Sequence, residues 1–238
     1  MIDTHCHLLP GLDDGPRVVG DSVDMGRALA AAGVTGVACT PHFSGRFPTP
    51  VDDGHAALEE LRVALAAESV ELEIVLGAEL SPAMALDAPD RELLDRTIGA
   101  GSLLVELESD TPVAAVDLVI ARLDDLGLRA VFAHPERCRA VRSRPRVLDG
   151  ARSAGALVQV VARSLRRSTR ADAGAAWDLL DAGRVDLIAS DAHRAADGAA
   201  LETALAEVRR RYGGAALTAL TDSVPARLLG RTGEDDGG

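Results

Sequence analysis

Seven short apolar segments recur along the chain, and stretches rich in Ala and Leu lie between them. The apolar segments are rich in Val, Ile and Leu and do not alternate with polar residues, which is typical of strands buried on both faces. Their starting points lie mostly 27–38 residues apart, the length of one strand plus one helix. Repeated strand–helix units without a hairpin signal predict a parallel sheet. The predicted strands are 1–5, 34–40, 72–78, 102–107, 129–133, 156–161 and 185–190.

The Ala- and Leu-rich stretches predict the helices of these units and two further helices that close the chain. With 238 residues, the chain is long enough to bury a sizeable core in one domain. We expect a single domain over 1–232, followed by a disordered acidic tail, GEDDGG, over 233–238. The predicted helices are 21–32, 54–68, 112–126, 145–154, 172–182, 197–212 and 214–229.

The charged composition excludes several classes of function. The chain has 37 acidic and 25 basic residues and a net charge of −12, so we expect no bulk attraction to nucleic acid or to an anionic membrane. Every basic residue is Arg, so a Schiff-base lysine and the lysine of a Walker A phosphate loop are both excluded.

Three further features predict a cytoplasmic protein. No apolar run approaches the roughly 20 residues that a membrane span needs, so we expect no membrane insertion. The opening MIDTHCHLLPG lacks the basic-then-apolar order of a secretory signal. Three Cys residues are too few for a disulfide framework in a chain of this length, which favours a reducing compartment.

Ionisable residues stand at or just past the C-terminal end of six of the seven predicted strands. In α/β barrels and open α/β sheets this end carries the active site. An unpaired ionisable group in a core is strongly unfavourable, so packing alone does not explain the pattern. Five of the six His residues belong to it, and only His55 lies in a predicted helix. The residues are His5, His7, His42, Glu79, Glu106, His134, Asp191 and His193.

The chemistry of these residues points to metal ions, because imidazole and carboxylate groups together suit Zn, Mn and Fe. His5 and His7 are two residues apart, so on an extended strand they point to the same face. Cys6 then points to the other face, and we expect it to pack in the core. The number of candidate ligands exceeds the need of one ion and fits two or three divalent ions bridged by carboxylates. Such a site activates water and holds both the attacking and the leaving oxygen of a phosphoester.

Five short motifs resemble those of the PHP (polymerase and histidinol phosphatase) family, in the same order and over nearly the whole chain. The opening IDTHCHLLPGLDDGP is more specific: it resembles the bacterial tyrosine-protein phosphatases of the PHP type that belong to capsular and exopolysaccharide operons. The five motifs are D-x-H-x-H at 3–7, T-P-H at 40–42, G-x-E at 77–79, H-P-E-R at 134–137 and S-D-A-H at 190–193.

The resemblance implies an α/β fold, a single distorted (β/α)7 barrel with the metal site at the C-terminal ends of the strands. It also implies two to three divalent ions, Mn first, with Fe or Zn as alternatives. Asp13 is the alternative to Asp14 as a ligand, and Glu108 is the rival of Glu106. By the family's pattern, one ion is held by His5, His7, Glu79 and Asp191, the second by Glu79, Glu106 and His134, and the third by Asp14, His42 and His193, with Glu79 as the bridge.

The resemblance further assigns the groups that meet the substrate. Arg137 of H-P-E-R would bind the phosphate, because a planar guanidinium meets two oxygens at once, and His193 would assist the leaving group. Glu136 is expected to form a structural ion pair. Relatives carry an Arg several residues after S-D-A-H, whereas here Arg194 follows directly and none comes later in the loop. Either Arg194 or Arg46 supplies the second phosphate contact, or phosphate recognition is weaker than in those relatives.

The implied function is hydrolysis of phosphotyrosine on a protein, namely a tyrosine kinase that regulates capsular or exopolysaccharide synthesis. One alternative is a PHP phosphatase for a small phosphoester such as histidinol phosphate. Another is a non-catalytic metal-containing binding protein, in which the Arg clusters at 137–146 and 163–170 engage an acidic partner or simply face solvent. A cysteine-dependent phosphatase is the weakest alternative: Cys138 and Arg144 have the required spacing, but no Gly lies between them and Pro145 follows.

Overall fold

The computed structural model describes residues 1–99, 101–166 and 171–231, and it contains all seven predicted strands. All of them pair in parallel, as repeated strand–helix units require. Their bounds are β1 Ile2–Cys6, β2 Gly36–Cys39, β4 Glu73–Leu76, β6 Ser102–Glu106, β7 Arg129–Ala133, β8 Leu157–Val161 and β9 Leu187–Ala189.

The strands form two parallel sheets, in the orders β1–β2–β4 and β3–β5–β6–β7–β8–β9, whereas the repeated units predict a single sheet. The division arises because β2 and β4 are each interrupted before a two-residue strand, β3 His42–Phe43 or β5 Glu79–Leu80. Pro41 lies in the first interruption and has no N–H to donate to a regular ladder. Hydrogen bonds from Gly77 and Glu79 N–H to the Cys39 and Pro41 carbonyl oxygens continue the pairing of the same two chain segments across the interruptions, so one sheet follows directly on the other.

The outer strands β1 and β9 also meet at their C-terminal ends. Cys6 and Ala192 form an isolated parallel bridge. Asp191 N–H donates to the His5 carbonyl oxygen, and His7 N–H donates to that of Ala192, both at 2.9 Å. Residues at the two ends of the sequence are thereby brought to one place.

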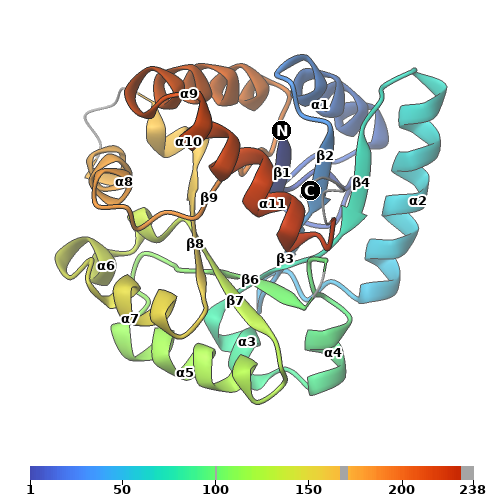
Figure 1. Cartoon of the computed structure of the whole chain (residues 1–238). Helices are drawn as coiled ribbons and strands as arrows, with labels where there is room; N and C mark the ends of the chain where they lie inside the picture. The colour runs from blue at the N-terminus through green and yellow to red at the C-terminus, as the bar shows by residue number, and fades with distance from the viewer. Residues whose placement is uncertain (100, 167–170, 232–238) are drawn as a thin grey trace, which may run out of the picture.

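A small apolar core lies between the two sheets and receives side chains from both. The C-terminal helices close this core at the N-terminal ends of the strands, where Arg231 pairs with Glu73 at 2.6 Å and the Met1 amino group pairs with Asp222 at 3.0 Å. In Figure 1, α11 crosses the strands at this end, so the opposite end is left for polar residues. The core contains Ala38, Ile98, Leu104, Val131, Ala133, Leu187 and Leu228.

Helices surround the strands and pack on them through a second, larger apolar core. Three of them, α3 Pro82–Asp87, α4 Asp90–Leu94 and α6 Arg139–Ser143, are not predicted by the sequence, because five or six residues are too few to show a repeating apolar face. The predicted helices form as α1 Val19–Ala31, α2 Val51–Ala67, α5 Val113–Asp124, α7 Val147–Ser153, α8 Ala171–Asp181 and α9 Ala196–Tyr212.

The prediction of one helix over 214–229 is wrong in detail. The structure divides this segment into α10 Gly214–Thr218, a π-helical turn Ala219–Ser223 and α11 Val224–Leu228. Pro225 has no N–H and its ring clashes with a carbonyl one turn earlier, and a π turn accommodates the clash. The expected tail at 233–238 lies outside the described residues. No helix within the described ranges combines the length and apolar character needed to cross a membrane.

Candidate metal centre

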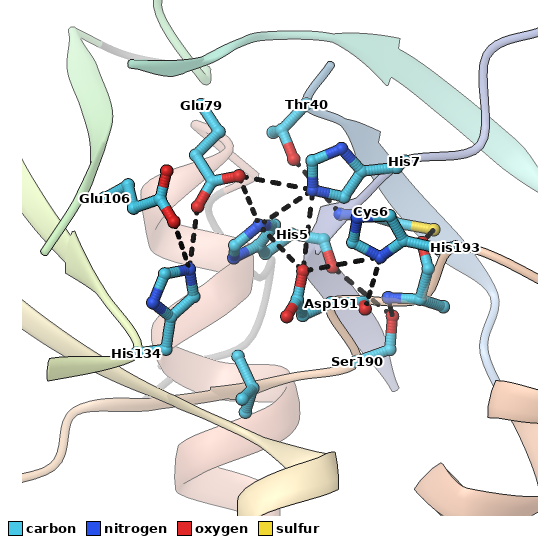
Figure 2. A network of polar contacts seen from close by, with 12 residues as sticks. His5, Cys6, His7, Thr40, Glu79, Glu106, His134, Ser190, Asp191 and His193 are labelled. Atoms are coloured by element: carbon cyan, nitrogen blue, oxygen red, sulfur yellow. Dashed lines mark hydrogen bonds and ion pairs between the residues drawn. The ribbon is translucent and has the colours of Figure 1, made fainter. Parts of the chain in front are cut away.

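The nine predicted metal ligands lie together at the C-terminal ends of the strands, and Figure 2 shows most of them pointing toward one another. Potential ligand atoms within 4.8 Å of one another form four overlapping groups. The overlap matters because one side chain then faces more than one potential ion position. The groups are His5, Glu79 and His134; His5, His7 and Asp191; His42, Glu79 and Glu106; and His7, Asp14, His42 and His193.

Burial divides the nine residues into two sets. The side chains of the inner set are only 0–3% exposed, whereas those of the outer set are 17–47% exposed. The inner residues are His5, His7, Glu79, His134 and Asp191. The outer residues are Asp14, His42, Glu106 and His193.

Hydrogen bonds fix the ring nitrogens of His5 and His7. His5 Nδ1 lies 2.9 Å from Gln159 Oε1, and His7 Nδ1 lies 2.6 Å from Asp13 Oδ2. Both partners are acceptors, so each Nδ1 carries a proton, and in a neutral ring each Nε2 then presents a lone pair. The two Nε2 atoms are 3.3 Å apart. Two lone pairs that face each other repel unless a cation lies beside them. Metal-binding imidazoles are typically held in this way, with the other ring nitrogen donating a hydrogen bond to an acceptor.

Glu79 lies at the centre of the inner set. Its Oε2 atom is buried and accepts no hydrogen bond among the described residues, although His42 Nδ1 lies 3.1 Å away and the Nε2 atoms of His5 and His7 lie 3.2 Å away. Its Oε1 atom lies 2.9 Å from His134 Nε2. A buried carboxylate that faces four imidazoles fits the role of a bridge between divalent cations. Burial alone would raise the pKa of Glu79, but the neighbouring His side chains hold it well below its ordinary value.

Two inner residues have a left-handed backbone. The φ angle is 33° at His134 and 51° at Asp191, in a region that residues other than Gly rarely adopt. Such a conformation costs about 1–3 kcal/mol and is found preferentially at functional sites. Asp191 Oδ1 lies 3.4 Å from His5 Nε2 and 3.5 Å from His7 Nε2. The strained turn after β9 thus presents a carboxylate to the imidazoles of both His5 and His7.

The outer set centres on Asp14. Its Oδ1 atom lies 3.2 Å from His193 Nε2 and 3.5 Å from His42 Nε2. His193 Nδ1 lies 3.0 Å from the Asp191 carbonyl oxygen, so its proton is held there and its Nε2 lone pair faces Asp14. Asp13 is turned inward instead: its Oδ2 atom accepts from His7 Nδ1 and, at 2.9 Å, from His42 N–H. The hydrogen bond to His7 holds the pKa of Asp13 at about 2 although burial acts to raise it.

Glu106 is the outer carboxylate whose protonation is most altered by its surroundings. Burial, together with the carboxylates of Glu79 and Glu108, raises the pKa of Glu106 to about 7. Glu108 itself is exposed and belongs to none of the four groups within the described chain. The structure therefore favours Glu106 over Glu108 as a candidate ligand.

The pKa values of the imidazoles depend on their neighbours. Burial lowers the pKa values of His42, His134 and His193. Burial acts in the same direction on His5 and His7, but the nearby carboxylates outweigh it and raise their pKa values. A metal ion competes with these protons, since only a neutral imidazole offers a lone pair.

Buried polar residues that the sequence analysis missed hold the inner set in place. Gln159 of β8 binds His5 Nδ1 and donates to Thr4 Oγ1 at 2.8 Å. Asp3 accepts from the N–H groups of His5 and Ser190 at 3.3 and 2.9 Å, which ties β1 to the end of β9. Gln159 could have been found, because it is the single polar residue in the apolar run LVQVV at 157–161.

The predicted substrate-binding arginines differ in their surroundings. Arg137 Nη2 donates to Asp191 Oδ2 at 2.6 Å, and its side chain is 29% exposed. Arg194 is 73% exposed, and its Nε atom lies 3.7 Å from Asp197. Arg46 is exposed, and its guanidinium lies over the ring of Phe47. Of these three arginines, Arg137 is the one that pairs with a residue of the inner set.

Glu136 differs from its expected role. It forms no ion pair within 4.0 Å among the described residues, and its Oε1 atom accepts from Val161 N–H at 3.2 Å. The side chain is completely buried, and this burial raises its pKa to about 7. Glu136 thus links the turn after β7 to β8.

The three cysteines are free and buried. Burial raises the pKa values of Cys6 and Cys39, so neither is an activated thiolate. The Cys138 thiol donates to the Thr111 carbonyl oxygen at 3.4 Å, and Arg144 is exposed. The Cys138–Arg144 segment therefore lacks the geometry of a phosphate loop with an accessible nucleophile.

The family described as "Capsular polysaccharide synthesis, CpsB/CapC" matches residues 1–230. The chain belongs to this family. Tyrosine-protein phosphatase YwqE of Bacillus subtilis (strain 168) is 30% identical over 197 residues, which cover 81% of this chain and 77% of that protein. The putative tyrosine-protein phosphatase CapC of Staphylococcus aureus is 25% identical over 200 residues, with the same coverage of 81% and 77%. The resemblance seen in the sequence motifs is thereby confirmed.

Solved structures agree with this membership. A crystal structure from the study of YwqE from Bacillus subtilis and CpsB from Streptococcus pneumoniae, "unique metal-dependent tyrosine phosphatases", matches with a TM-score of 0.83 at 27% identity, covering 98% of this chain and 96% of that one. Dihydropyrimidinase from Brevibacillus agri matches with a TM-score of 0.57 at 15% identity, covering 97% and 70%. The second likeness concerns the fold alone.

Proposed function

We propose that this CpsB/CapC protein is a metal-dependent phosphoesterase that hydrolyses phosphotyrosine on proteins. The observation that carries the proposal is the pair formed by His5 and His7: both Nδ1 atoms are committed to hydrogen bonds, while both Nε2 atoms face each other and Glu79. Divalent cations satisfy this arrangement. Relatives named tyrosine-protein phosphatases support the activity and its substrate class.

The donor set suits two to three divalent ions, with Mn first and Fe or Zn as alternatives. Bound there, such ions activate water and stabilise negative charge on phosphoryl oxygens. The Asp14 carboxylate, facing two imidazoles, supports its choice over Asp13, which is occupied by His7. We assign His5, His7, Glu79 and Asp191 to the first ion, Glu79, Glu106 and His134 to the second, and Asp14, His42 and His193 to the third.

The chain's own residues position the substrate. The contact with Asp191 orients the Arg137 guanidinium in advance, and its other N–H groups are available for a bidentate contact with phosphate. The leaving tyrosinate has a reference pKa of about 10, so it needs less protonation than an alkoxide. We assign His193, at the partly exposed edge of the site, to the leaving oxygen through the ion that its Nε2 atom would hold, because its Nδ1 proton is committed to the Asp191 carbonyl oxygen.

The partner we propose is a tyrosine kinase that regulates capsular or exopolysaccharide synthesis. The family description supports the biological context. Exposed arginines follow β7 and β8, and they would attract acidic residues around a phosphotyrosine in spite of the overall charge of −12. Arg167 and Arg170 lie outside the described residues. The exposed arginines that the structure describes in these two segments are Arg139, Arg144, Arg146, Arg163 and Arg166.

Three broader proposals accompany this function. The two linked sheets are best counted as one distorted (β/α)7 barrel, because they share a core and meet at both seams. Residues 1–232 form one domain, with 233–238 as an acidic tail. The protein acts in the cytoplasm, where its free thiols stay reduced.

The test uses protein purified without chelator, analysed for its metals and assayed on phosphotyrosine and phosphoserine peptides of one sequence. We expect bound Mn, Fe or Zn, a preference for phosphotyrosine, loss of activity on chelation, and no loss on thiol alkylation. Activity that survives chelation and disappears on alkylation would favour Cys138 as a nucleophile. Preference for histidinol phosphate over both peptides would assign a small-molecule substrate.

A further inference from the structure

The chain is poor in aromatic residues, and their positions single out one of them. It has three Phe, one Trp and one Tyr, all within the described ranges. Phe43 and Phe132 are buried in the core. Trp177 and Tyr212 stack on each other, with ring centroids 6.3 Å apart, where α8 and α9 meet. Phe47 is the remaining ring, and it lies against the candidate metal centre.

Phe47 is stacked on a proposed metal ligand. Its ring centroid lies 5.5 Å from that of His42, and the two planes differ by 9°. The Arg46 guanidinium carbon lies 4.9 Å from the Phe47 centroid. The ring is partly exposed, so it forms an apolar wall at the edge of a site that is otherwise built of ionisable groups.

Hydrogen bonds hold the backbone of the loop that bears this ring. Ser44 N–H donates to the Phe47 carbonyl oxygen and Phe47 N–H donates to that of Ser44, both at 3.1 Å, which defines a tight two-residue turn. Arg96 lies over the Phe43 ring and donates to the Thr49 carbonyl oxygen at 2.9 Å. The loop is therefore held at both ends, and little order has to be gained on binding.

Thr49 also anchors the loop to the segment that bears Asp13 and Asp14. Its hydroxyl donates to the Leu12 carbonyl oxygen at 3.3 Å. The position of Phe47 is thus coupled to the outer set of residues on two sides, through the His42 ring and through this contact. The wall and the outer ligands form one structural unit.

We propose that Phe47 recognises the aromatic ring of the substrate and makes the site select aryl over alkyl phosphoesters. One ester oxygen separates the phosphorus of phosphotyrosine from its ring, so a phosphate at the ions places that ring beside the outer ligands. Contact between aromatic rings contributes about 0.5–1.5 kcal/mol beyond burial, which corresponds to roughly two- to twelvefold in affinity. The inference rests on the proposed function, since it names the residue that gives the same site its substrate class.

The test compares Phe47→Leu, which keeps apolar bulk, with Phe47→Tyr, which keeps the ring. The probes are phenylphosphonate and methylphosphonate, which are not hydrolysed, as competitive inhibitors of the holoenzyme; kcat and KM for a phosphotyrosine peptide are measured alongside. We expect Phe47→Leu to weaken phenylphosphonate about threefold to tenfold, to leave methylphosphonate unchanged, and to raise KM more than it lowers kcat. Phe47→Tyr should retain the wild-type ratio of the two inhibition constants. Leu118→Ala, at an exposed site on α5, is the control for substitution itself.

Equal weakening of both phosphonates, or of neither, would overturn the proposal and leave Phe47 as a support for His42. Metal content is measured on every variant. Loss of metal with an unchanged inhibition ratio would contradict the proposal in the same way, because the ratio does not depend on the loaded fraction. The proposed function fails separately. A wild-type protein that hydrolyses para-nitrophenyl phosphate, is inhibited by phenylphosphonate through Phe47 and does not hydrolyse phosphotyrosine peptide would refute the proposed activity on proteins and keep the role of the ring.

Discussion

The inner and outer sets of the candidate metal centre are built on different principles. Several inner side chains have a buried contact that orients them, such as Gln159 for His5, Asp13 for His7 or Arg137 for Asp191. The outer residues are partly exposed, and they face inner residues as well as one another, as His42 faces both Glu79 and Asp14. The buried contacts orient the inner set before any ion binds. The outer set is the part that a substrate reaches from solvent, which is where selectivity would be expressed.

The largest effect is expected at Glu79, an inner residue that also faces His42 of the outer set. Glu79→Gln keeps the shape of the side chain but removes the charge that faces four imidazoles. Activity should fall by more than about 100-fold, beyond the usual cost of losing an outer-shell partner, and metal content should fall with it. Elemental analysis and a phosphatase assay on the same sample measure both. Full activity in this variant would contradict the assignment of Glu79 as the bridging ligand.

The next largest effect is expected at Arg137, in contrast to Arg194. Arg137→Ala should lower kcat/KM about 100-fold, the cost of one charged donor in a preorganised site, with metal content close to that of wild type. Arg194→Ala is the matched control, because Arg194 is mostly exposed and lies near Asp197. Its loss should change kcat/KM by less than about twofold, since exposed ion pairs contribute little. If Arg137→Ala loses its metals, the residue acts by holding Asp191.

Gln159→Leu tests whether the inner set depends on its buried support. The variant removes the acceptor for His5 Nδ1 and frees the ring to change tautomer. Metal affinity should fall by about 10–100-fold, with kcat restored when excess metal is supplied. Dialysis against graded metal buffers gives the affinity. An unchanged affinity would show that the inner set is fixed by the metals instead of by the fold.

Asp14→Asn should have a smaller effect, because it alters only the outer set. We expect loss of about one ion, retention of the others, and a roughly tenfold decrease in activity, at the low end of what single metal-site partners contribute. Asp13→Asn, a neighbour of equal size, should instead weaken the ions of the inner set through His7. If both variants lose the same ions, the distinction between the inner and outer sets is wrong.

The smallest effect concerns pH. With a pKa raised to about 7, Glu106 holds a proton at lower pH, and an ion must displace that proton to bind. Apparent metal affinity should therefore rise as pH increases through about 7, and the protons of His5 and His7 extend the rise to higher pH. Glu106→Gln should reduce this dependence. Glu136→Gln is the control, since the pKa of Glu136 is also about 7 but its side chain is not a proposed ligand. If this control also reduces the pH dependence of metal affinity, that dependence does not arise from Glu106.

Much of the architecture is predictable from the sequence, for identifiable reasons. The seven strands are recognisable because most of them are short, largely apolar runs. The convergence of the strand-end His and carboxylate residues follows from parallel strand direction. The division into two sheets is not predictable in this way, because it depends on the short interruptions that follow β2 and β4. Helices as short as α4 carry no periodic signal.

The details of the site are harder to predict than its composition. The left-handed backbone at His134 and Asp191 is imposed by the surrounding fold, because even His and Asp, which enter this region more often than most residues other than Gly, rarely adopt it. The D-D-G segment offers two equivalent carboxylates, and only the structure separates Asp14, which faces His193, from Asp13, which supports His7. The stacking of Phe47 on His42 depends on a tight turn whose sequence, SGRF, specifies no partner.

The burial of all three thiols bears on how the protein responds to hydrogen peroxide. Hydrogen peroxide inactivates enzymes that depend on an exposed thiolate. Here Cys6 lies between two histidines of the centre in sequence yet packs in the core, with its pKa raised well above the ordinary value. With all three thiols buried, the protein offers peroxide no exposed cysteine to oxidise.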